Sequence, residues 1–260
     1  MQTSEMVRSG RKAAVGAAFG AAASHYEASA GVQRTVAAHL ATMAARERLR
    51  ESAHILEIGC GTGLLTGEIR ARWPDATLIA TDLAPEMLAV TDRRGAASQI
   101  LAMDGEAPVF AGAWFDLILS SLAFQWFADL PAALTRLHDL LRPGASLYFA
   151  TMGAESFASW RAAHIACGES AGIADYPTLA HLQAMLAAHG DAFVCDEHHA
   201  LPERGGAALV RHFKSLGAQV PREGYAPLGP AAMRRVIRAF DAAGGETSYH
   251  VLYGRITHAP

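Results

Sequence analysis

The chain has 260 residues, of which 51% are hydrophobic and 18% are charged, so it can bury a sizeable core and is not a disordered chain. Its net charge of −3 and its pI of about 6.4 argue against a general nucleic-acid binder. No stretch approaches the roughly 18 uninterrupted apolar residues of a membrane helix. The three cysteines form no CxxC pair, which disfavours a disulfide framework and favours a reducing cytoplasm.

The N-terminal segment superficially resembles a secretory signal, because basic residues within positions 8–12 precede an alanine-rich stretch. Val15 and Phe19 are the only large apolar residues of that stretch, however, and an amphipathic helical pattern follows it. We therefore expect no export, a flexible tail over residues 1–12 and helical structure over residues 13–50.

From residue 53 onward, short apolar runs alternate with helical patterns. Such alternation predicts parallel strands joined by right-handed crossovers, which is a doubly wound α/β sheet. Through residue 152 the predicted strands are 54–58, 77–83, 99–103, 115–122 and 146–152, and the predicted helices are 64–73, one from Pro85, and 130–141, which ends before Arg142-Pro143-Gly144. Farther on, helices are predicted at 157–167, 178–189, 207–216 and 233–240, and strands at 192–201 and 248–256.

A glycine-rich loop, Glu57-Ile58-Gly59-Cys60-Gly61-Thr62-Gly63, joins the first predicted strand to the first helix and is the strongest motif. Glycines there permit a tight turn and let the backbone approach a ligand closely. Asp82 ends the second strand 19 residues after the last glycine, where a carboxylate can accept both hydrogen bonds of a ribose diol. A nicotinamide enzyme is disfavoured, because Leu64 replaces the third glycine of G-x-G-x-x-G and no second dinucleotide half follows residue 152.

The pattern E-x-G-x-G-x-G, with Asp82 and with Asp104 after the third strand, resembles the class I S-adenosylmethionine-dependent methyltransferases. The resemblance implies a seven-stranded, mostly parallel, Rossmann-like sheet with N-terminal helices and a helical insertion after strand five. The implied domain is 13–260, comprising an N-terminal helical segment 13–50, a cofactor-binding half 53–152 and an acceptor-side half 153–260.

The same resemblance implies S-adenosylmethionine as the cofactor, S-adenosylhomocysteine as its product, and no metal. Glu57 and the glycines would line the methionine portion, Asp82 the ribose, and Asp104 the adenine edge. The residues implied to bind the cofactor are Tyr26, Glu57, Gly59, Cys60, Gly61, Gly63, Asp82, Leu83, Met87, Asp104, Gly105, Glu106, Ser120 and Ser121.

Two further motifs suggest a hydrolase and a metal site, but neither has the predicted secondary structure that such a site needs. Gly168-Glu169-Ser170-Ala171-Gly172 matches a hydrolase nucleophile elbow, which needs a strand before it, whereas a predicted helix precedes it here. His198-His199 lies on a predicted strand, where adjacent side chains face opposite ways and cannot easily chelate one metal ion. We therefore expect neither a hydrolase nor a metal enzyme.

Four segments carry a closer resemblance. They are Phe19 with Ser24-His25-Tyr26-Glu27 and Gln33; Phe124-Gln125-Trp126; Thr151-Met152-Gly153-Ala154-Glu155-Ser156-Phe157; and Phe213-Lys214-Ser215-Leu216-Gly217-Ala218 with Glu223-Gly224-Tyr225 and Ser248-Tyr249-His250. In this order and spacing they are similar, across nearly the whole chain, to the malonyl-(acyl-carrier protein) O-methyltransferase family of biotin biosynthesis. The chain departs from that family at Ser121, where asparagine is frequent, and at Trp160-Arg161, where Leu-Arg or Leu-His is more usual.

This resemblance implies methyl transfer to the free carboxylate of a malonyl thioester on acyl-carrier protein, giving a methyl ester primer for biotin (pimeloyl) synthesis. A carboxylate is ionised at pH 7, so the reaction needs no general base. No catalytic residue is assigned, and the acceptor-side candidates are Tyr26, Phe124, Trp126, Arg161, Lys214 and Tyr225. Two alternatives stay open: a methyltransferase of a free small carboxylic acid, and a related respiratory-complex assembly factor that acts on a partner protein.

Residues 201–260 carry a net charge of +4, whereas residues 1–200 carry −7. Carrier proteins are acidic, so we expect this basic part to dock the acyl-carrier protein, although a solvated surface with scattered arginines is the alternative. The docking candidates are Arg211, Lys214, Arg234, Arg235 and Arg238. Neither a nucleic acid nor a membrane is expected as a partner, and a cytoplasmic location is expected.

Overall fold

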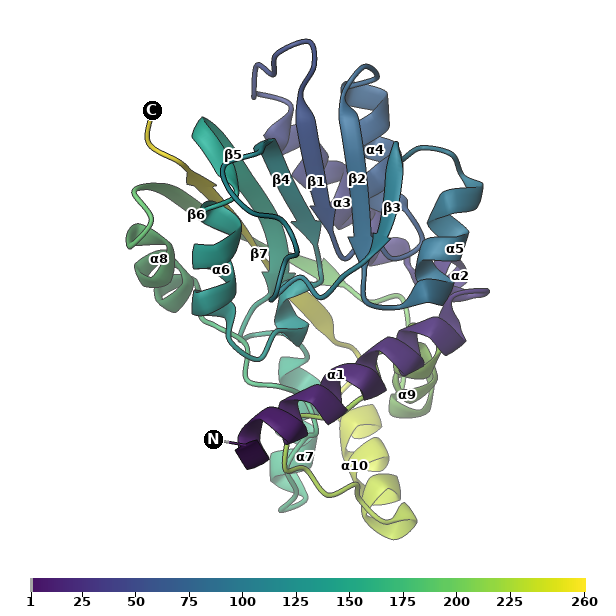
Figure 1. Cartoon of the computed structure of the whole chain (residues 1–260). Coiled ribbons are helices and arrows are strands. Elements are labelled where there is room, and N and C mark those ends of the chain that lie inside the picture. The colour runs from purple at the N-terminus through teal and green to yellow at the C-terminus, as the bar shows by residue number, and fades with distance from the viewer. Residues whose placement is uncertain (1) are drawn as a thin grey trace.

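The computed structural model describes residues 2–260, with side chains described from residue 10 onward. Its strands are β1 (His54–Ile58), β2 (Thr77–Asp82), β3 (Gln99–Ala102), β4 (Phe115–Ser121), β5 (Leu141–Met152), β6 (Asp191–Ala200) and β7 (Ser248–Thr257). They form one sheet in the order β3-β2-β1-β4-β5-β7-β6, and every neighbouring pair is parallel except the two pairs that include β7 (Figure 1). This arrangement confirms the seven-stranded, mostly parallel sheet that the sequence predicts.

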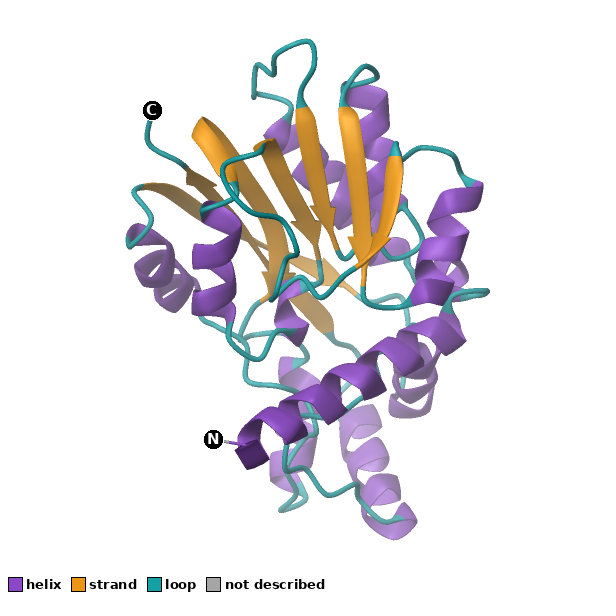
Figure 2. Ribbon diagram, viewed as in Figure 1, coloured by secondary structure: helices purple, strands orange, loops and turns teal. Residues whose placement is uncertain are grey.

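Helices cover both faces of the sheet (Figure 2). They are α1 (Gln2–Ala22), α2 (Tyr26–Ser29), α3 (Gly31–Ala44), α4 (Leu64–Arg72), α5 (Pro85–Arg93), α6 (Leu130–His138), α7 (Ala158–Ala166), α8 (Leu179–Ala187), α9 (Gly206–Ser215) and α10 (Pro230–Ala242), with a 3-10 turn η1 (Phe124–Trp126) after β4. Helices α3 and α4 pack on one face, and α6 and α8 pack on the other (Figure 1). Because both faces are covered, the central strands are buried, apolar runs.

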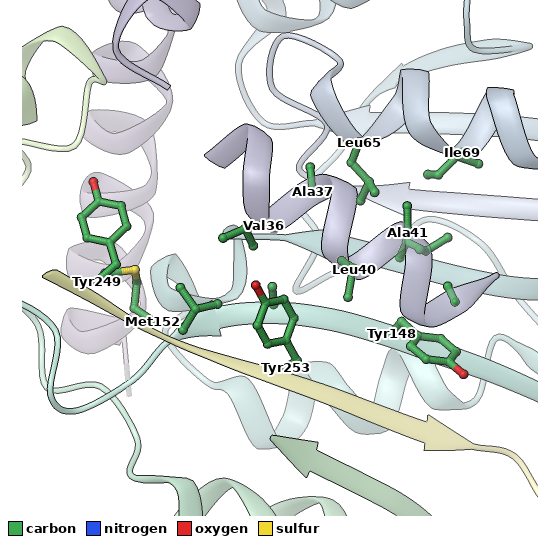
Figure 3. Close-up of a cluster of buried hydrophobic side chains, with 14 of the residues drawn as sticks. Val36, Ala37, Leu40, Ala41, Leu65, Ile69, Tyr148, Met152, Tyr249 and Tyr253 are labelled. Atoms are coloured by element: carbon green, nitrogen blue, oxygen red, sulfur yellow. The ribbon is translucent and has the colours of Figure 1, made fainter. Parts of the chain in front are cut away.

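The core beneath α3 and α4 is built from side chains at helical spacing that meet the sheet (Figure 3). Val36 and Leu40 of α3 are fully buried and belong to one cluster with Ile69 of α4. Tyr148 of β5 and Tyr253 of β7 complete this cluster from the sheet side. The opposite core is formed by leucines of α6 and α8 against Phe149 of β5. These two layers fix the strand ends at which the site lies.

Strand β5 begins at Leu141, five residues before the predicted start. Leu141 pairs with Phe115 of β4, and the register then shifts before Ser146 pairs with Leu117. Gly144, whose φ is +78°, lies in this irregular part, and its N–H donates to the carbonyl of His258 at 3.0 Å. Helix α6 ends at His138, so the prediction that it runs to residue 141 and is ended by Arg142-Pro143-Gly144 is wrong; that segment is instead an irregular part of β5.

The N-terminal segment differs most from its prediction. Helix α1 begins at Gln2, so the flexible tail expected over residues 1–12 is wrong for residues 2–12, while Met1 lies outside the described residues. Alanine is the strongest helix former, and Lys12 and Val15 anchor the helix to the rest of the molecule. The helical segment predicted over 13–50 is divided into α1, α2 and α3 and ends at Ala44.

Helix α1 crosses the end of the sheet at which the parallel strands finish, and α7, α9 and α10 are drawn at the same end of the molecule (Figure 1). In α/β sheets, ligands bind outside these carboxyl ends. None of the helices in the described part of the chain is long and apolar enough to span a membrane.

Candidate active site

The glycine loop joins β1 to α4 and turns sharply because three of its residues take left-handed conformations. Gly59, Gly61 and Gly63 have φ values of +71°, +54° and +89°, a region that side chains other than glycine rarely adopt. At Gly59 a Cβ atom would also lie 2.4 Å from the Cβ of Ala123, the residue just before η1. The loop therefore exposes backbone at the edge of a cavity instead of side chains.

Asp82, the last residue of β2, connects this loop to the neighbouring strand. Its Oδ2 accepts a hydrogen bond from the Gly61 N–H at 2.8 Å, and its Oδ1 accepts one from the Ala84 N–H at 2.8 Å. Burial raises the pKa of Asp82, while these backbone donors oppose the increase. Each carboxylate oxygen keeps a free lone pair, so Asp82 can hold the loop and still accept hydroxyl groups of a ligand.

Glu57 is a buried carboxyl group at the end of β1 that lines the same cavity. Neither of its oxygens has a hydrogen-bond partner among the described residues. Burial raises the pKa of Glu57 to about 8, opposed by nearby Thr66 and increased further by the charge of Asp82. An unpartnered buried carboxyl group is costly unless a ligand pairs with it, so Glu57 marks a subsite for a cationic group.

Two more acids lie beyond β3 and are held by a lysine of α1. Lys12 Nζ lies 2.5 Å from Asp104 Oδ2 and 2.6 Å from Glu106 Oε2. The other oxygen of Glu106 accepts hydrogen bonds from the N–H groups of Ala128 and Asp129 at 3.0 and 2.8 Å. These contacts connect the N-terminal helix to the loop after β3 and close this end of the cavity.

The cavity brings together nearly all of the residues predicted to bind the cofactor. Gly63 and Ser120 are the two that do not line it. Gly63 precedes α4 and faces Thr91 and Arg94 of the α5 region, and the Ser120 hydroxyl donates to the Ile58 carbonyl inside the sheet at 2.9 Å. The predicted residues that do line it are Tyr26, Glu57, Gly59, Cys60, Gly61, Asp82, Leu83, Met87, Asp104, Gly105, Glu106 and Ser121.

A second cavity shares a wall with the first. The residues that line both are Phe19, Tyr26, Gln33, Leu122 and Trp126. Phe19 of α1 meets Trp126 of η1 edge-on, with ring centroids 5.3 Å apart. The two cavities therefore adjoin at these largely apolar residues, and direct transfer between two bound ligands requires adjoining sites.

Four of the acceptor-side candidates line the second cavity, and two do not. Tyr26, Trp126, Lys214 and Tyr225 line it. Phe124 is instead 1% exposed and packs against Phe127 and Phe149 in the core. The guanidinium of Arg161 donates to the carbonyls of Ser156 and Ala174 at 3.2 and 2.7 Å, so it braces the loop after α7.

The two cavities differ in the charge of the side chains that line them. The first is lined by Glu57, Asp82, Asp104 and Glu106, with Lys12 as its one described cation. The second is lined by Arg11 and Lys214, and no aspartate or glutamate of the described side chains lines it. The first cavity therefore suits a ligand with cationic and hydroxyl groups, and the second suits an anion.

Sequence reasoning missed Arg11 and gave no site role to Gln33 and Tyr249, which also line the second cavity. Tyr249 of β7 lies 3.3 Å from His212 Nε2, whose Nδ1 lies 2.8 Å from Glu203. Burial raises the pKa values of Tyr26 and Tyr249, so both hydroxyls stay protonated donors at neutral pH. Gln33 and Tyr249 belong to the segments that carry the family resemblance, which is the signal that could have identified them.

Comparison with known proteins places the chain. A family model described as a methyltransferase domain matches residues 56–149. The biotin biosynthesis bifunctional protein BioCD of Bordetella avium is 41% identical over 238 residues, which are 91% of this chain and 50% of that protein, so the chain spans half its length. The malonyl-(acyl-carrier protein) O-methyltransferase of Magnetococcus marinus is 38% identical over 258 residues, which cover 96% of this chain and 94% of that protein. The chain belongs to this O-methyltransferase family.

The fold agrees with solved structures of other methyltransferases. The plantazolicin methyltransferase BpumL, in complex with S-adenosylhomocysteine, matches with a TM-score of 0.56 over 100% of both chains, at 14% sequence identity. At this identity the likeness concerns the fold alone. Together with the family, it confirms the prediction of an S-adenosylmethionine-dependent methyltransferase.

Proposed function

We propose that this chain transfers a methyl group from S-adenosylmethionine to the free carboxylate of a malonyl thioester on acyl-carrier protein. The observation that carries the proposal is the pair of cavities with one shared wall and opposite charge, because an anionic acceptor fits the acid-free second cavity. The names of the most similar relatives support the same acceptor. We assign residues 53–152 mainly to the cofactor and residues 153–260 mainly to the acceptor side, while the N-terminal helices contribute to both cavities.

The first cavity fits the cofactor. Bound there, S-adenosylmethionine supplies an electrophilic methyl group on a positively charged sulfur. The unpartnered carboxyl of Glu57 suits the ammonium group of the methionine portion, and the oxygens of Asp82 suit the ribose hydroxyls. Asp104 and Glu106 would border the adenine, where Lys12 already balances their charge.

The residues at the shared wall need only hold the acceptor in line and exclude water. A malonyl carboxylate is ionised at pH 7, so no side chain has to remove a proton. Correct alignment alone can contribute about 7–11 kcal/mol to lowering the barrier. Phe19 and Trp126 exclude water from the wall, and the Tyr26 hydroxyl is the protonated donor that lines both cavities.

Carrier-protein docking is the finer part of this proposal. Arg211, Arg234 and Arg238 are exposed on α9 and α10, near the chain segments that line the second cavity, and they offer charge complementarity to an acidic carrier. Lys214 lines the cavity mouth from α9. Arg235 is less available for docking than these arginines, because it donates to Glu169 at 2.8 Å.

We further propose a cytoplasmic location, which suits three free thiols.

The direct test is methyl transfer from labelled S-adenosylmethionine to malonyl-carrier protein, followed by detection of a base-labile methyl ester. We expect labelled ester with the wild type and little with Asp82→Ala. Methylation of malonyl-CoA or of a free dicarboxylic acid at equal rates would show a small-molecule enzyme instead. Label on a partner protein, without any ester on the carrier, would show the assembly-factor alternative.

A further inference from the structure

Arg11 and Lys12, adjacent on α1, enter different cavities. Successive residues on a helix point about 100° apart, and here Lys12 reaches the acids of the cofactor cavity while Arg11 lines the second cavity. Trp126 lines both cavities and contacts the guanidinium of Arg11. The cationic group of Arg11 thus lies where the two cavities meet.

The guanidinium of Arg11 is poorly satisfied by the protein. Its Nη1 donates to the Trp126 carbonyl at 3.4 Å, and its central carbon lies 5.9 Å from the centroid of the Trp126 ring. Among the side chains described from residue 10 onward, none hydrogen-bonds to its buried Nε and none forms an ion pair with the guanidinium. Arg11 is half-buried and lines the second cavity with little pairing from the described residues, and a guanidinium pairs strongly with a carboxylate, so this geometry points to an anionic ligand.

Arg161, near the same cavity, differs from Arg11 because its guanidinium is held by the protein backbone. Its Nε and Nη2 both donate to backbone carbonyls. Both guanidinium groups act on Tyr176, which lines the second cavity: burial raises the pKa of Tyr176 to about 12, and the charges of Arg161 and Arg11 oppose this increase. Arg161 is thus occupied by the fold, whereas Arg11 keeps a donor for a ligand.

We propose that Arg11 binds the free carboxylate of the acceptor through its guanidinium group and thereby selects an anionic acceptor. This inference rests on the proposed function and adds the residue that recognises the reacting group. A single charged hydrogen bond fixes the carboxylate while leaving its second oxygen free to attack. A bidentate contact would instead hold both oxygens and reduce their nucleophilicity.

The test compares wild type with Arg11→Gln, which keeps a polar side chain but removes the charge. We expect KM for malonyl-carrier protein to rise about 10- to 100-fold, the loss of one hydrogen bond to a charged group, while the affinity for S-adenosylhomocysteine stays unchanged. Inhibition by carrier loaded with a neutral acetoacetyl group gives a second readout. Wild type should bind the malonyl form much more tightly than the neutral form, and Arg11→Gln should lose this preference.

Arg46, exposed in the turn after α3, provides the matched control, and Arg46→Gln should behave as wild type. Arg11→Lys should recover part of the charge preference. If wild type forms no ester on malonyl-carrier protein, the proposed function is wrong. If wild type forms ester and Arg11→Gln has the same KM and the same preference, the role of Arg11 is wrong. The role of Arg11 would also be wrong if a lower affinity for S-adenosylhomocysteine accounted for the whole loss of activity in Arg11→Gln. Arg11 would then act only by supporting α1.

Discussion

Lys12 Nζ and Asp104 Oδ2 lie 2.5 Å apart, although 92 residues separate them in the chain. Burial lowers the pKa of Lys12, but its contacts with Asp104 and Glu106 outweigh this effect and raise it, so the contact stays charged at neutral pH. Helix α1 is thereby fixed across the mouth of the cofactor cavity, which Val15, Gly16 and Phe19 line from above.

Replacing Lys12 by methionine should therefore weaken both the fold and the cofactor site. The change leaves Asp104 and Glu106 without their cation, and we expect a loss of about 1–3 kcal/mol in the free energy of unfolding. Dissociation of S-adenosylhomocysteine should become faster, because α1 loses its contact with the loop after β3. Denaturant unfolding and stopped-flow release measure the two effects, with Lys214→Met as the control for lysine removal outside this cavity. Equal release rates in Lys12→Met and wild type would contradict a closing role for α1.

Cofactor binding should release a proton from Glu57. The pKa of this carboxyl group is raised from an ordinary 4.5 to about 8 by burial, so it is mostly protonated at pH 7, and a cationic ligand favours its ionised form. We expect the affinity for S-adenosylhomocysteine to rise by up to about tenfold per pH unit between pH 5 and 8 and to level off above pH 8. The unliganded protein should lose stability as the pH rises over the same window, because the unfolded chain releases a proton that the native state still holds.

Calorimetry in buffers of different ionisation enthalpy counts the released proton directly. Glu57→Gln should release none and should lose the pH dependence of binding, whereas Glu51→Gln, an exposed change before β1, should keep both. An unchanged proton count in Glu57→Gln would assign the titration to another group.

Alanine should have opposite effects at two glycines a few residues apart. Gly59 has a left-handed backbone, and its added Cβ would lie 2.4 Å from Ala123, so Gly59→Ala should cost at least about 1–3 kcal/mol of stability and abolish cofactor binding. Gly67 is within α4 and has open space around it, so Gly67→Ala should stabilise by about 0.5–1 kcal/mol. Thermal unfolding with and without S-adenosylhomocysteine measures both, and a stable, cofactor-binding Gly59→Ala protein would contradict this view of the loop.

Charge reversal on α9 and α10 should affect only the carrier-bound acceptor. Arg211→Glu or Arg238→Glu should raise KM for malonyl-carrier protein on the order of 3- to 10-fold at low salt, and less at high salt, because these exposed charges are screened. Activity on malonyl-CoA and affinity for S-adenosylhomocysteine should not change. Arg46→Glu controls for net charge, and an identical rise in KM with it would remove the case for a specific docking face.

Much of the fold could be predicted because each element carries its own local signal. The run His54–Ile58 is both the predicted and the observed β1, and Pro85 begins α5 as its fixed φ favours. The start of β5 could not be predicted in this way. Pro143-Gly144 is typical of a turn, and whether the strand includes it depends on pairing with Phe115 and contact with His258, which are distant in sequence.

The cofactor side of the site was predictable for the same reason that the sheet was. Glu57 and Asp82 end adjacent parallel strands, so the topology alone brings them together. The acceptor side was predicted only in part: four of its six candidates line the second cavity, whereas Arg11, Gln33 and Tyr249 converge on it from α1, α3 and β7. Arg11 was also assigned to a flexible tail, although its place eight residues before Phe19 on a continuous alanine-rich helix puts both near the same opening.

Phe19, Leu122 and Trp126, which line both cavities, affect the polarity of the medium in which the proposed reaction takes place. In the proposed reaction a sulfonium ion and a carboxylate, which meet at these residues, become a thioether and an ester, so these two charges cancel as the methyl group moves. A reaction that destroys charge is faster in a weakly polarisable medium than in water, which stabilises the separated ions. The apolar rings would thus accelerate the step that they surround, and the methyl ester that forms would lose the attraction to Arg11 that its carboxylate precursor had.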